Sequence, residues 1–299
     1  MSLLNRPGDG NRSVLTVIYK LLLQEGVLDY DRIIKLCAPE GIVEAKETRQ
    51  TLNTWIDLGI FTKEADKVSI NSEIKRAERD LIHLPRHARE RVIKKENNER
   101  FLEIEDSKAS DFCRACSWLL SQDVYTFDCN SWNEAEPFIK QQTRDSAHLI
   151  AQNDTRWSGF KDWAVYLGFA CIGRFPKSGS LIIDPTNAIY KELDLIFGRT
   201  KTLTADQFLA KLSNQVPVLD DGEYRLIIEE ELRKVSGENA WRSAPGGQLS
   251  TSLSRAILRL EVVGVLKCEN KSDAPKRAIL TGRNGSVINT FSHFTLIRN

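Results

Sequence analysis

Two cysteines three positions apart, Cys113 and Cys116, have the spacing of a metal-binding or redox pair, and Cys129 and His148 follow them. A structural zinc site needs four ligands and usually takes them from two such pairs. Here the second pair is missing, and the first lies within residues 111–120, whose apolar side chains recur at helical spacing. A redox pair would stand at the start of a helix that follows a strand. We therefore predict that both thiols pack as small core residues and that the chain binds no metal.

Other residues that could do chemistry lack the neighbours that the chemistry needs. His83 and His87 are four positions apart, but Pro85 lies between them and no His-Glu-x-x-His motif is present. The glycine-rich stretches 245–247 and 282–285 do not have the spacing of a phosphate-binding loop. The sequence thus predicts a protein without a cofactor that is not an enzyme, although a catalytic site of dispersed residues would leave no motif.

The composition is that of an ordinary globular protein. The chain has 299 residues, of which 41% are hydrophobic and 28% charged, and its six cysteines show no regular spacing. We expect two or three domains and reduced thiols. The first residues have no apolar segment of the kind that directs secretion, and the longest apolar run, 14–23, is too short to span a membrane. We expect a cytoplasmic protein without membrane contact.

The net charge of +1 limits how the chain could bind nucleic acid. Proteins that coat DNA are usually basic overall, because phosphate neutralisation provides most of the non-specific affinity. Contact with DNA would therefore depend on local patches, and two are present. Residues 75–100 hold nine Lys or Arg against five Asp or Glu, and residues 267–283 hold five against two. Both patches are equally well explained as solvated faces.

The first 74 residues have the element order of a winged helix, in which three short helices precede a small β-hairpin. Apolar residues recur at helical spacing, and Gly59 is placed to end the third helix. Two short strands joined by a polar turn follow it. The predicted helices are 12–24, 31–37 and 43–58, and the predicted strands are 60–61 and 68–70.

The far end of the chain repeats this pattern around Gly264. We predict two earlier helices at 204–213 and 222–235, and strands at 265–266 and 278–280. The apolar residues before Gly59 and before Gly264 stand at the same intervals from their glycine: Leu52, Trp55 and Leu58 in the first case, and Ile257, Leu260 and Val263 in the second.

The middle of the chain is predicted to be helical. Residues 75–101 indicate a charged linker helix broken near Pro85, and a helix at 160–169 with a strand at 180–183 forms an imperfect third copy around Gly168. The predicted fold class is therefore mostly α with small β wings. It comprises a winged helix-turn-helix domain at each end, residues 1–74 and 201–299, and a helical middle region, residues 75–200, that includes the degenerate copy.

In a winged helix the third helix enters the major groove, and its exposed face supplies base and phosphate contacts. Two predicted sets mix amide, hydroxyl and basic groups, as duplex contact requires. They also fit the polar faces of ordinary amphipathic helices, and Glu44 and Glu47 would repel phosphate. The first set is Lys46, Arg49, Gln50 and Asn53 with Lys63 and Lys67 on the hairpin, and the second is Ser250, Thr251, Ser254, Arg255 and Arg259 with Lys271, Lys276 and Arg277.

Several landmarks resemble the DpdG-type proteins, which are encoded in bacterial clusters that place 7-deazaguanine derivatives in DNA and restrict unmodified phage or plasmid DNA. The resemblance spans nearly the whole chain and implies a non-catalytic accessory component of a modification-dependent restriction system, with partner proteins encoded alongside. Because the landmarks are packing features, no catalytic residue is carried over. They are LLNRPGDGNR at 3–12, ACSWLL at 115–120, WAVYLGF at 163–169 and DPTNAI at 184–189.

We therefore expect a DNA-binding and assembly subunit in bacterial anti-phage defence, with double-stranded DNA and other proteins of the same gene cluster as partners. Two alternatives stay open: a winged-helix scaffold that docks only proteins, and a winged-helix transcriptional regulator. The neighbouring genes would separate defence from regulation.

Metal analysis tests the interpretation of the thiols. Purified protein is expected to contain no stoichiometric zinc, because thiols that pack in an apolar core do not serve as ligands. A content of about one zinc per chain, lost when Cys113 or Cys116 is changed to Ser, would show that the pair binds metal.

Overall fold

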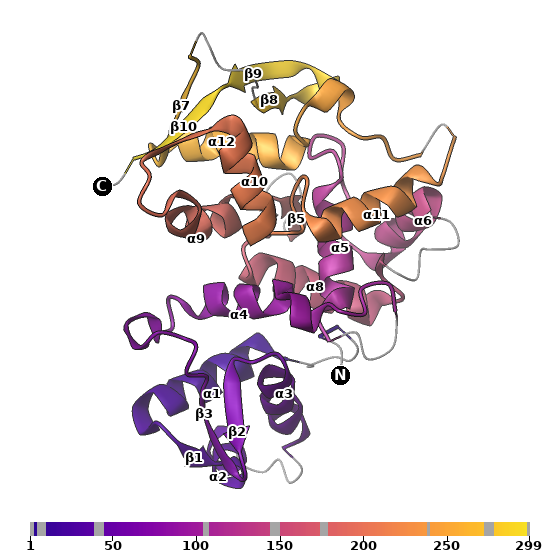
Figure 1. Cartoon of the computed structure of the whole chain (residues 1–299). Coiled ribbons are helices and arrows are strands. Elements are labelled where there is room, and N and C mark those ends of the chain that lie inside the picture. Colours follow the sequence, from indigo (N-terminus) through magenta and orange to yellow (C-terminus); the bar gives the residue numbers. More distant parts are fainter. Residues whose placement is uncertain are drawn as a thin grey trace. The chain divides into compact units, whose positions relative to one another are not determined.

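The structure, a computed structural model, describes residues 3–4, 10–38, 45–103, 108–143, 150–173, 179–237, 240–271 and 278–297. It is built mainly of helices with small antiparallel sheets (Figure 1), which confirms the predicted mostly α fold class. The chain forms two compact units: unit 1 comprises residues 1–113 and 155–167, and unit 2 comprises residues 114–154 and 168–299. The finer division into three domains stays a prediction.

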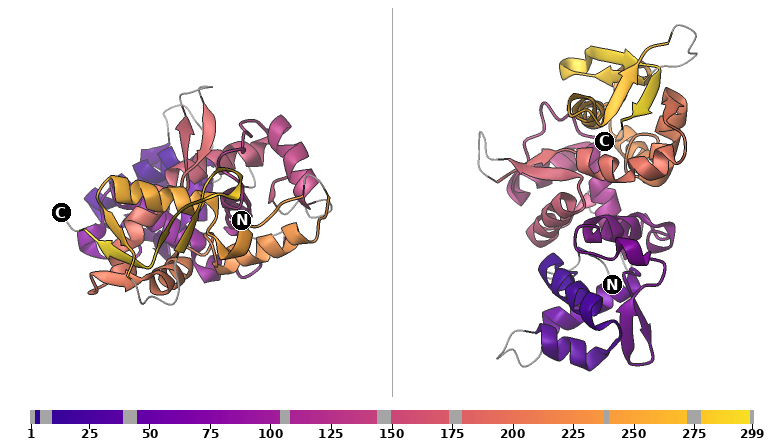
Figure 2. Two further views of the ribbon diagram at one scale, coloured as in Figure 1. Left: turned by 90° about the horizontal axis from the view of Figure 1, so that it is seen from above. Right: turned by 90° about the vertical axis from the view of Figure 1, so that its left-hand side faces the viewer.

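Unit 1 contains the three helices and the two later strands in the order that the sequence predicts, and an additional strand, β1, lies between the first two helices (Figures 1 and 2). The Asn11 side chain caps the first helix by accepting a hydrogen bond from the Ser13 N–H (2.8 Å). The sheet is antiparallel with the order β1-β3-β2. The strand β1 has two residues, which is too short for an alternating hydrophobic pattern to reveal it in the sequence. The elements are α1 (Arg12–Glu25), β1 (Leu28–Asp29), α2 (Tyr30–Cys37), α3 (Lys46–Asp57), β2 (Phe61–Glu64) and β3 (Lys67–Ile70).

The charged segment 75–101 does not form the long linker helix that its composition predicts. Pro85 lies in the first turn of a short helix, where a missing N–H costs little. The side chains of Asn97 and Asn98 donate to the carbonyls of Arg91 (2.8 Å) and Val92 (2.7 Å), which ends that helix. The segment contains the 3₁₀ turn Arg76–Glu78, α4 (Leu84–Ile93) and the 3₁₀ turn Lys95–Asn97.

Aromatic contacts and one buried cation hold the rest of unit 1 together. The rings of Trp55 and Trp163, on α3 and on α8 (Asp154–Tyr166), have centroids 5.2 Å apart. Arg89 of α4 is 1% exposed, and its Nη1 donates to the Leu167 carbonyl at 2.9 Å. A cation is favourable there, because the carbonyl dipoles at the end of a helix point toward it. The two helices α4 and α8 are thus joined by a charge-assisted hydrogen bond.

Unit 2 contains the remaining helices and three small sheets (Figure 1). The helices predicted at 204–213 and 222–235 are present. The helices are α6 (Trp132–Thr143), α9 (Thr186–Phe197), α10 (Ala205–Gln215), α11 (Glu223–Arg233) and α12 (Thr251–Val262), and α5 (Ser110–Leu120) begins in unit 1 and continues into unit 2. The strands are β4 (Ala170–Gly173), β5 (Ser180–Ile183), β6 (Thr202–Thr204), β7 (Leu266–Glu269), β8 (Ala278–Thr281), β9 (Val287–Phe291) and β10 (His293–Leu296).

Unit 2 repeats the hydrogen bonds of unit 1 at the end of the third helix. Gly59 and Gly264 both have positive φ, +90° and +73°. The next residue donates back into the helix in each case, from Ile60 to Trp55 and from Val265 to Leu260, both at 2.9 Å. The predicted equivalence of the two helix ends is therefore confirmed, and neither helix continues past its glycine.

The strand that returns after β7 is not the predicted one. The sequence places it at 278–280, but β8 pairs with β9, and β10 pairs with β7. The sheet β6-β10-β7 then has the same antiparallel order as β1-β3-β2. The hairpin β8–β9 is inserted between β7 and β10, and local alternation cannot show which strand pairs with which.

Substitution of Gly264 tests the role of its backbone conformation. Nothing lies within 4 Å of the Cβ that an alanine would add, so steric clash with neighbours is excluded. Gly264→Ala is expected to lower the free energy of unfolding by about 1 kcal/mol, and Gly264→Asn by less, because Asn tolerates the left-handed region better. Denaturant melts measure both values, and equal or negligible losses would contradict the expectation.

Candidate nucleic-acid interface

The structure brings several residues of the first predicted set together on unit 1. Lys46, Arg49, Lys63 and Lys67 are exposed, and Gln50 and Asn53 are partly exposed. Tyr30, the first residue of α2, joins three of them. Its hydroxyl donates to Asn53 Oδ1 (3.0 Å), and its ring centroid lies 4.5 Å from Lys63 Nζ and 6.0 Å from the Arg49 guanidinium carbon.

Tyr30 itself was not predicted as part of this face. An aromatic residue at the start of a helix is usually predicted to pack in the core. The ring of a tyrosine can also attract a cation, and its hydroxyl can form a hydrogen bond, and Tyr30 makes both kinds of contact. We name the surface formed by Tyr30, Lys46, Arg49, Asn53 and Lys63 the α3 face.

Carboxylates lie beside the cations of the α3 face. Asp31 Oδ1 is 3.4 Å from Arg49 Nη1, with side chains 86% and 47% exposed. Lys67, next to this face on the hairpin, has Glu64 and Asp29 as its register partners on the neighbouring strands. An exposed ion pair such as that of Asp31 with Arg49 contributes about 0–1 kcal/mol. The cations are therefore able to exchange these partners for a phosphate at little cost, but the face is of mixed charge.

The second predicted set is not an exposed face. Thr251 and Ser254 are buried, and the prediction that they are exposed is wrong. Thr251 Oγ1 accepts a hydrogen bond from the Val124 N–H (3.0 Å), and Ser254 Oγ accepts one from the Thr281 N–H (2.8 Å). Helical spacing marks small polar residues as outward-facing, but here chain segments distant in sequence cover them.

The remaining residues of the second set are divided between internal contacts and solvent. The Arg255 guanidinium carbon lies 5.5 Å from the Tyr125 ring centroid, and Arg259 forms an ion pair with Asp184. Ser250 is buried as the N-cap of α12. Lys271 is exposed, whereas Lys276 and Arg277 lie outside the described residues.

The basic patch at 75–100 is partly used within unit 1. Arg89 is buried, Arg91 pairs with Glu73, and Arg86 pairs with Glu90 (3.1 Å). Arg79 donates to the carbonyls of Ile74 and Asn71. The patch is therefore divided. Four arginines, Arg79, Arg86, Arg89 and Arg91, are used within unit 1, and five cations are exposed as on a solvated face: Lys75, Arg76, Lys94, Lys95 and Arg100.

The cysteines pack as predicted. Cys113 and Cys116 are 0% exposed within α5, and burial raises the pKa of Cys129 to about 11. His148 lies outside the described residues. Within the described ranges, no group of three or more His, Cys, Asp or Glu side chains could hold a metal ion, and no helix has the length and apolarity needed to cross a bilayer.

Comparison with known proteins identifies the family. A family model described as DpdG-like matches residues 1–274. The chain belongs to the DpdG-like family. This confirms the resemblance seen in the sequence and connects the DpdG-like chain with a Dpd-type DNA-modification system. The comparisons with curated proteins and with solved structures found no match.

The structural role of Ser254 in the DpdG-like chain can be tested against an exposed serine. Ser254→Ala is expected to lower the free energy of unfolding by about 1–3 kcal/mol, because the buried Thr281 N–H loses its acceptor. The control Ser158→Ala, at an exposed position of α8, should change it by less than about 0.5 kcal/mol. Thermal or urea melts measure both, and equal small effects would show that Ser254 is not needed for folding.

Proposed function

We propose that this chain binds double-stranded DNA through the α3 face of unit 1, as a non-catalytic accessory subunit of a Dpd-type DNA-modification and restriction system in the cytoplasm. The observation that carries the proposal is the gathering of Arg49, Asn53 and Lys63 around Tyr30 on an exposed surface. These residues come from α3 and β2, with Tyr30 from α2.

The arrangement of elements supports this use. Three helices with a three-stranded sheet in the order β1-β3-β2 match the winged version of the helix-turn-helix, whose third helix enters the major groove. Arginine and asparagine on that helix are the side chains best suited to the edges of guanine and adenine. Lysines on the hairpin suit phosphate oxygens, which fix the position of the protein on the duplex.

The related arrangement in unit 2 supports a different role for that unit. Counted back from the glycine that ends the third helix, Ser254 occupies the position of Arg49, and Thr251 occupies the position of Lys46. At these positions unit 2 has buried hydroxyls in place of exposed cations. We propose that duplex contact belongs to unit 1 and that unit 2 serves assembly with proteins of the same gene cluster.

A scaffold that docks only proteins is the second candidate. The carboxylates on or beside the α3 face, Asp31 and Glu47, favour it, because a phosphate would approach them only against repulsion. A partner protein with both acidic and basic residues would match such a mixed surface.

Removal of two cations from the α3 face separates the candidates. If Lys46 and Arg49 contact phosphate, Lys46→Ala/Arg49→Ala should weaken duplex binding for all sequences and lower the slope of log affinity against log salt by about one for each contact. Gel-shift titrations at about 50 mM and about 200 mM salt measure the slope. Both side chains are exposed, so stability should change by less than roughly 0.5 kcal/mol per position.

The matched control removes two exposed cations of the same unit that lie outside α3 and the β2–β3 hairpin. Lys20 and Arg100 meet this condition, and Lys20→Ala/Arg100→Ala should leave affinity and slope unchanged. Equal losses in both double variants would indicate non-specific attraction. A parent protein that binds no duplex at low salt would favour the protein-docking scaffold.

A further inference from the structure

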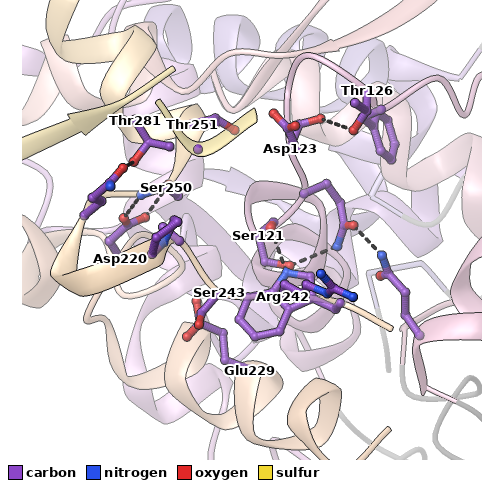
Figure 3. Close-up of a pocket in the computed structure, with 18 of the residues that line it drawn as sticks. Ser121, Asp123, Thr126, Asp220, Glu229, Arg242, Ser243, Ser250, Thr251 and Thr281 are labelled. Carbon is purple, nitrogen blue, oxygen red and sulfur yellow. Dashed lines mark hydrogen bonds between the residues drawn. The ribbon is translucent and has the colours of Figure 1, made fainter. Parts of the chain in front are cut away.

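Unit 2 contains a cavity of about 720 Å³. It lies among the segment that follows α5, helices α6 and α11, the loop before α12 and the end of β8. Figure 3 shows Asp220 with Ser250 on one side of it and Asp123 with Thr126 on another. Pockets that take small organic ligands have volumes of roughly 300–1,000 Å³. The cavity is therefore large enough for a nucleotide-sized molecule.

A buried arginine with an unused donor lines this cavity. Arg225 is 2% exposed, and its Nε donates to Glu229 Oε1 at 2.6 Å. Nη1 is buried and has no hydrogen-bond partner among the described residues. Asp220 Oδ1 is 3.8 Å from Nη1, beyond hydrogen-bond distance. A buried N–H without an acceptor is unfavourable, so a ligand in the cavity whose acceptor reached Nη1, after a small shift of the side chains that cover this nitrogen, would satisfy it.

The two carboxylates beside Arg225 are held in fixed positions. Asp220 accepts hydrogen bonds from the N–H and the hydroxyl of Ser250, both at 2.6 Å. Glu229 Oε2 accepts one from Arg233 Nη2 at 2.7 Å. A carboxylate offers about four lone-pair sites, so both can still accept from a ligand.

This arrangement selects the chemistry of the ligand. A phosphate or carboxylate placed at Nη1 would be repelled by Asp220 and Glu229. A neutral carbonyl with an N–H beside it would accept from Arg225 and donate to one of the carboxylates. Such a lactam edge is found in guanine, uracil and thymine, and is missing in adenine and cytosine.

An aromatic wall and nearby cations complete a nucleotide-like set of partners. The Trp241 indole is held by a hydrogen bond from its N–H to the Ser121 carbonyl (2.9 Å), and the Arg233 guanidinium carbon lies 5.7 Å from its ring centroid. Arg242, the next residue, is exposed and lines the cavity. A flat ring can stack on the indole while a phosphate meets Arg242, as in proteins that hold single nucleotides.

We propose that this cavity binds a nucleobase with a lactam edge. Arg225 donates to the base carbonyl, Asp220 or Glu229 accepts the ring N–H, Trp241 stacks on the ring, and Arg242 meets the phosphate. The base comes either from a free nucleotide or from a single strand. This inference does not depend on duplex binding by the α3 face.

Calorimetric titration of the full chain with four nucleoside monophosphates tests the proposal. GMP and UMP should bind, and AMP and CMP should bind at least about tenfold more weakly, since they lack the lactam edge. Arg225→Lys, which keeps the charge but loses the planar donors, should weaken GMP and UMP binding by about tenfold or more. The control Arg199→Ala, an exposed arginine that does not line the cavity, should have no effect.

Single strands of dT and dA distinguish the source of the base. Free-nucleotide binding supports a metabolite-sized ligand, and binding of the dT strand alone, with the same dependence on Arg225, supports a base within a strand. If Arg225→Lys does not fold, Trp241→Leu gives the second test and should weaken binding of the preferred base.

Equal affinity for all four bases, no binding of any probe, or binding that ignores both Arg225 and Trp241 would overturn the proposal. The Lys46→Ala/Arg49→Ala variant should bind nucleotides normally. Failure at the α3 face and failure at this cavity are therefore distinguishable.

Discussion

In both units a helix turns into a strand through one hydrogen bond, which the residue after a glycine donates back into the helix. Ile60 donates to Trp55 and Val265 donates to Leu260, and the positive φ of Gly59 and Gly264 makes this reversal possible. The bond directs the next strand against the apolar side of the helix it has just left. From this turn β2 and β7 enter the sheets β1-β3-β2 and β6-β10-β7.

The same frame carries different surfaces because the flanking chain differs. In unit 1, the positions of Lys46 and Arg49 on α3 are exposed. In unit 2, the corresponding hydroxyls of Thr251 and Ser254 accept backbone N–H groups from segments far away in the sequence. Tyr30 corresponds to Ala205. Each begins the helix that follows the first strand of its sheet (β1 or β6), and the N–H of each donates to the residue before the last strand of that sheet (β3 or β10). Unit 2 thus lacks the tyrosine around which the α3 face is organised.

Two arginines are equally buried but have different surroundings. Arg89 donates to the last carbonyl after α8, so its guanidinium joins two helices of unit 1. Arg225 also has a fixed partner in Glu229, but it lines a cavity. Arg89 does not line this cavity and joins two helices, so Arg225 is the candidate binding group of the two.

Local periodicity in the sequence determined the helices, the glycines that end them and the burial of Cys113 and Cys116, because these depend on neighbours within a few turns. It also located Lys46, Arg49 and Lys63, whose exposure follows from the same periodicity. The tertiary structure alone decided that β10 and not β8 pairs with β7. Both segments have the sequence pattern of a strand, so local pattern does not show which of them is the partner. It alone buried Ser254 and placed Tyr30 beside Asn53. The cavity around Arg225 was likewise invisible in the sequence, since its walls come from segments about a hundred residues apart that form no motif.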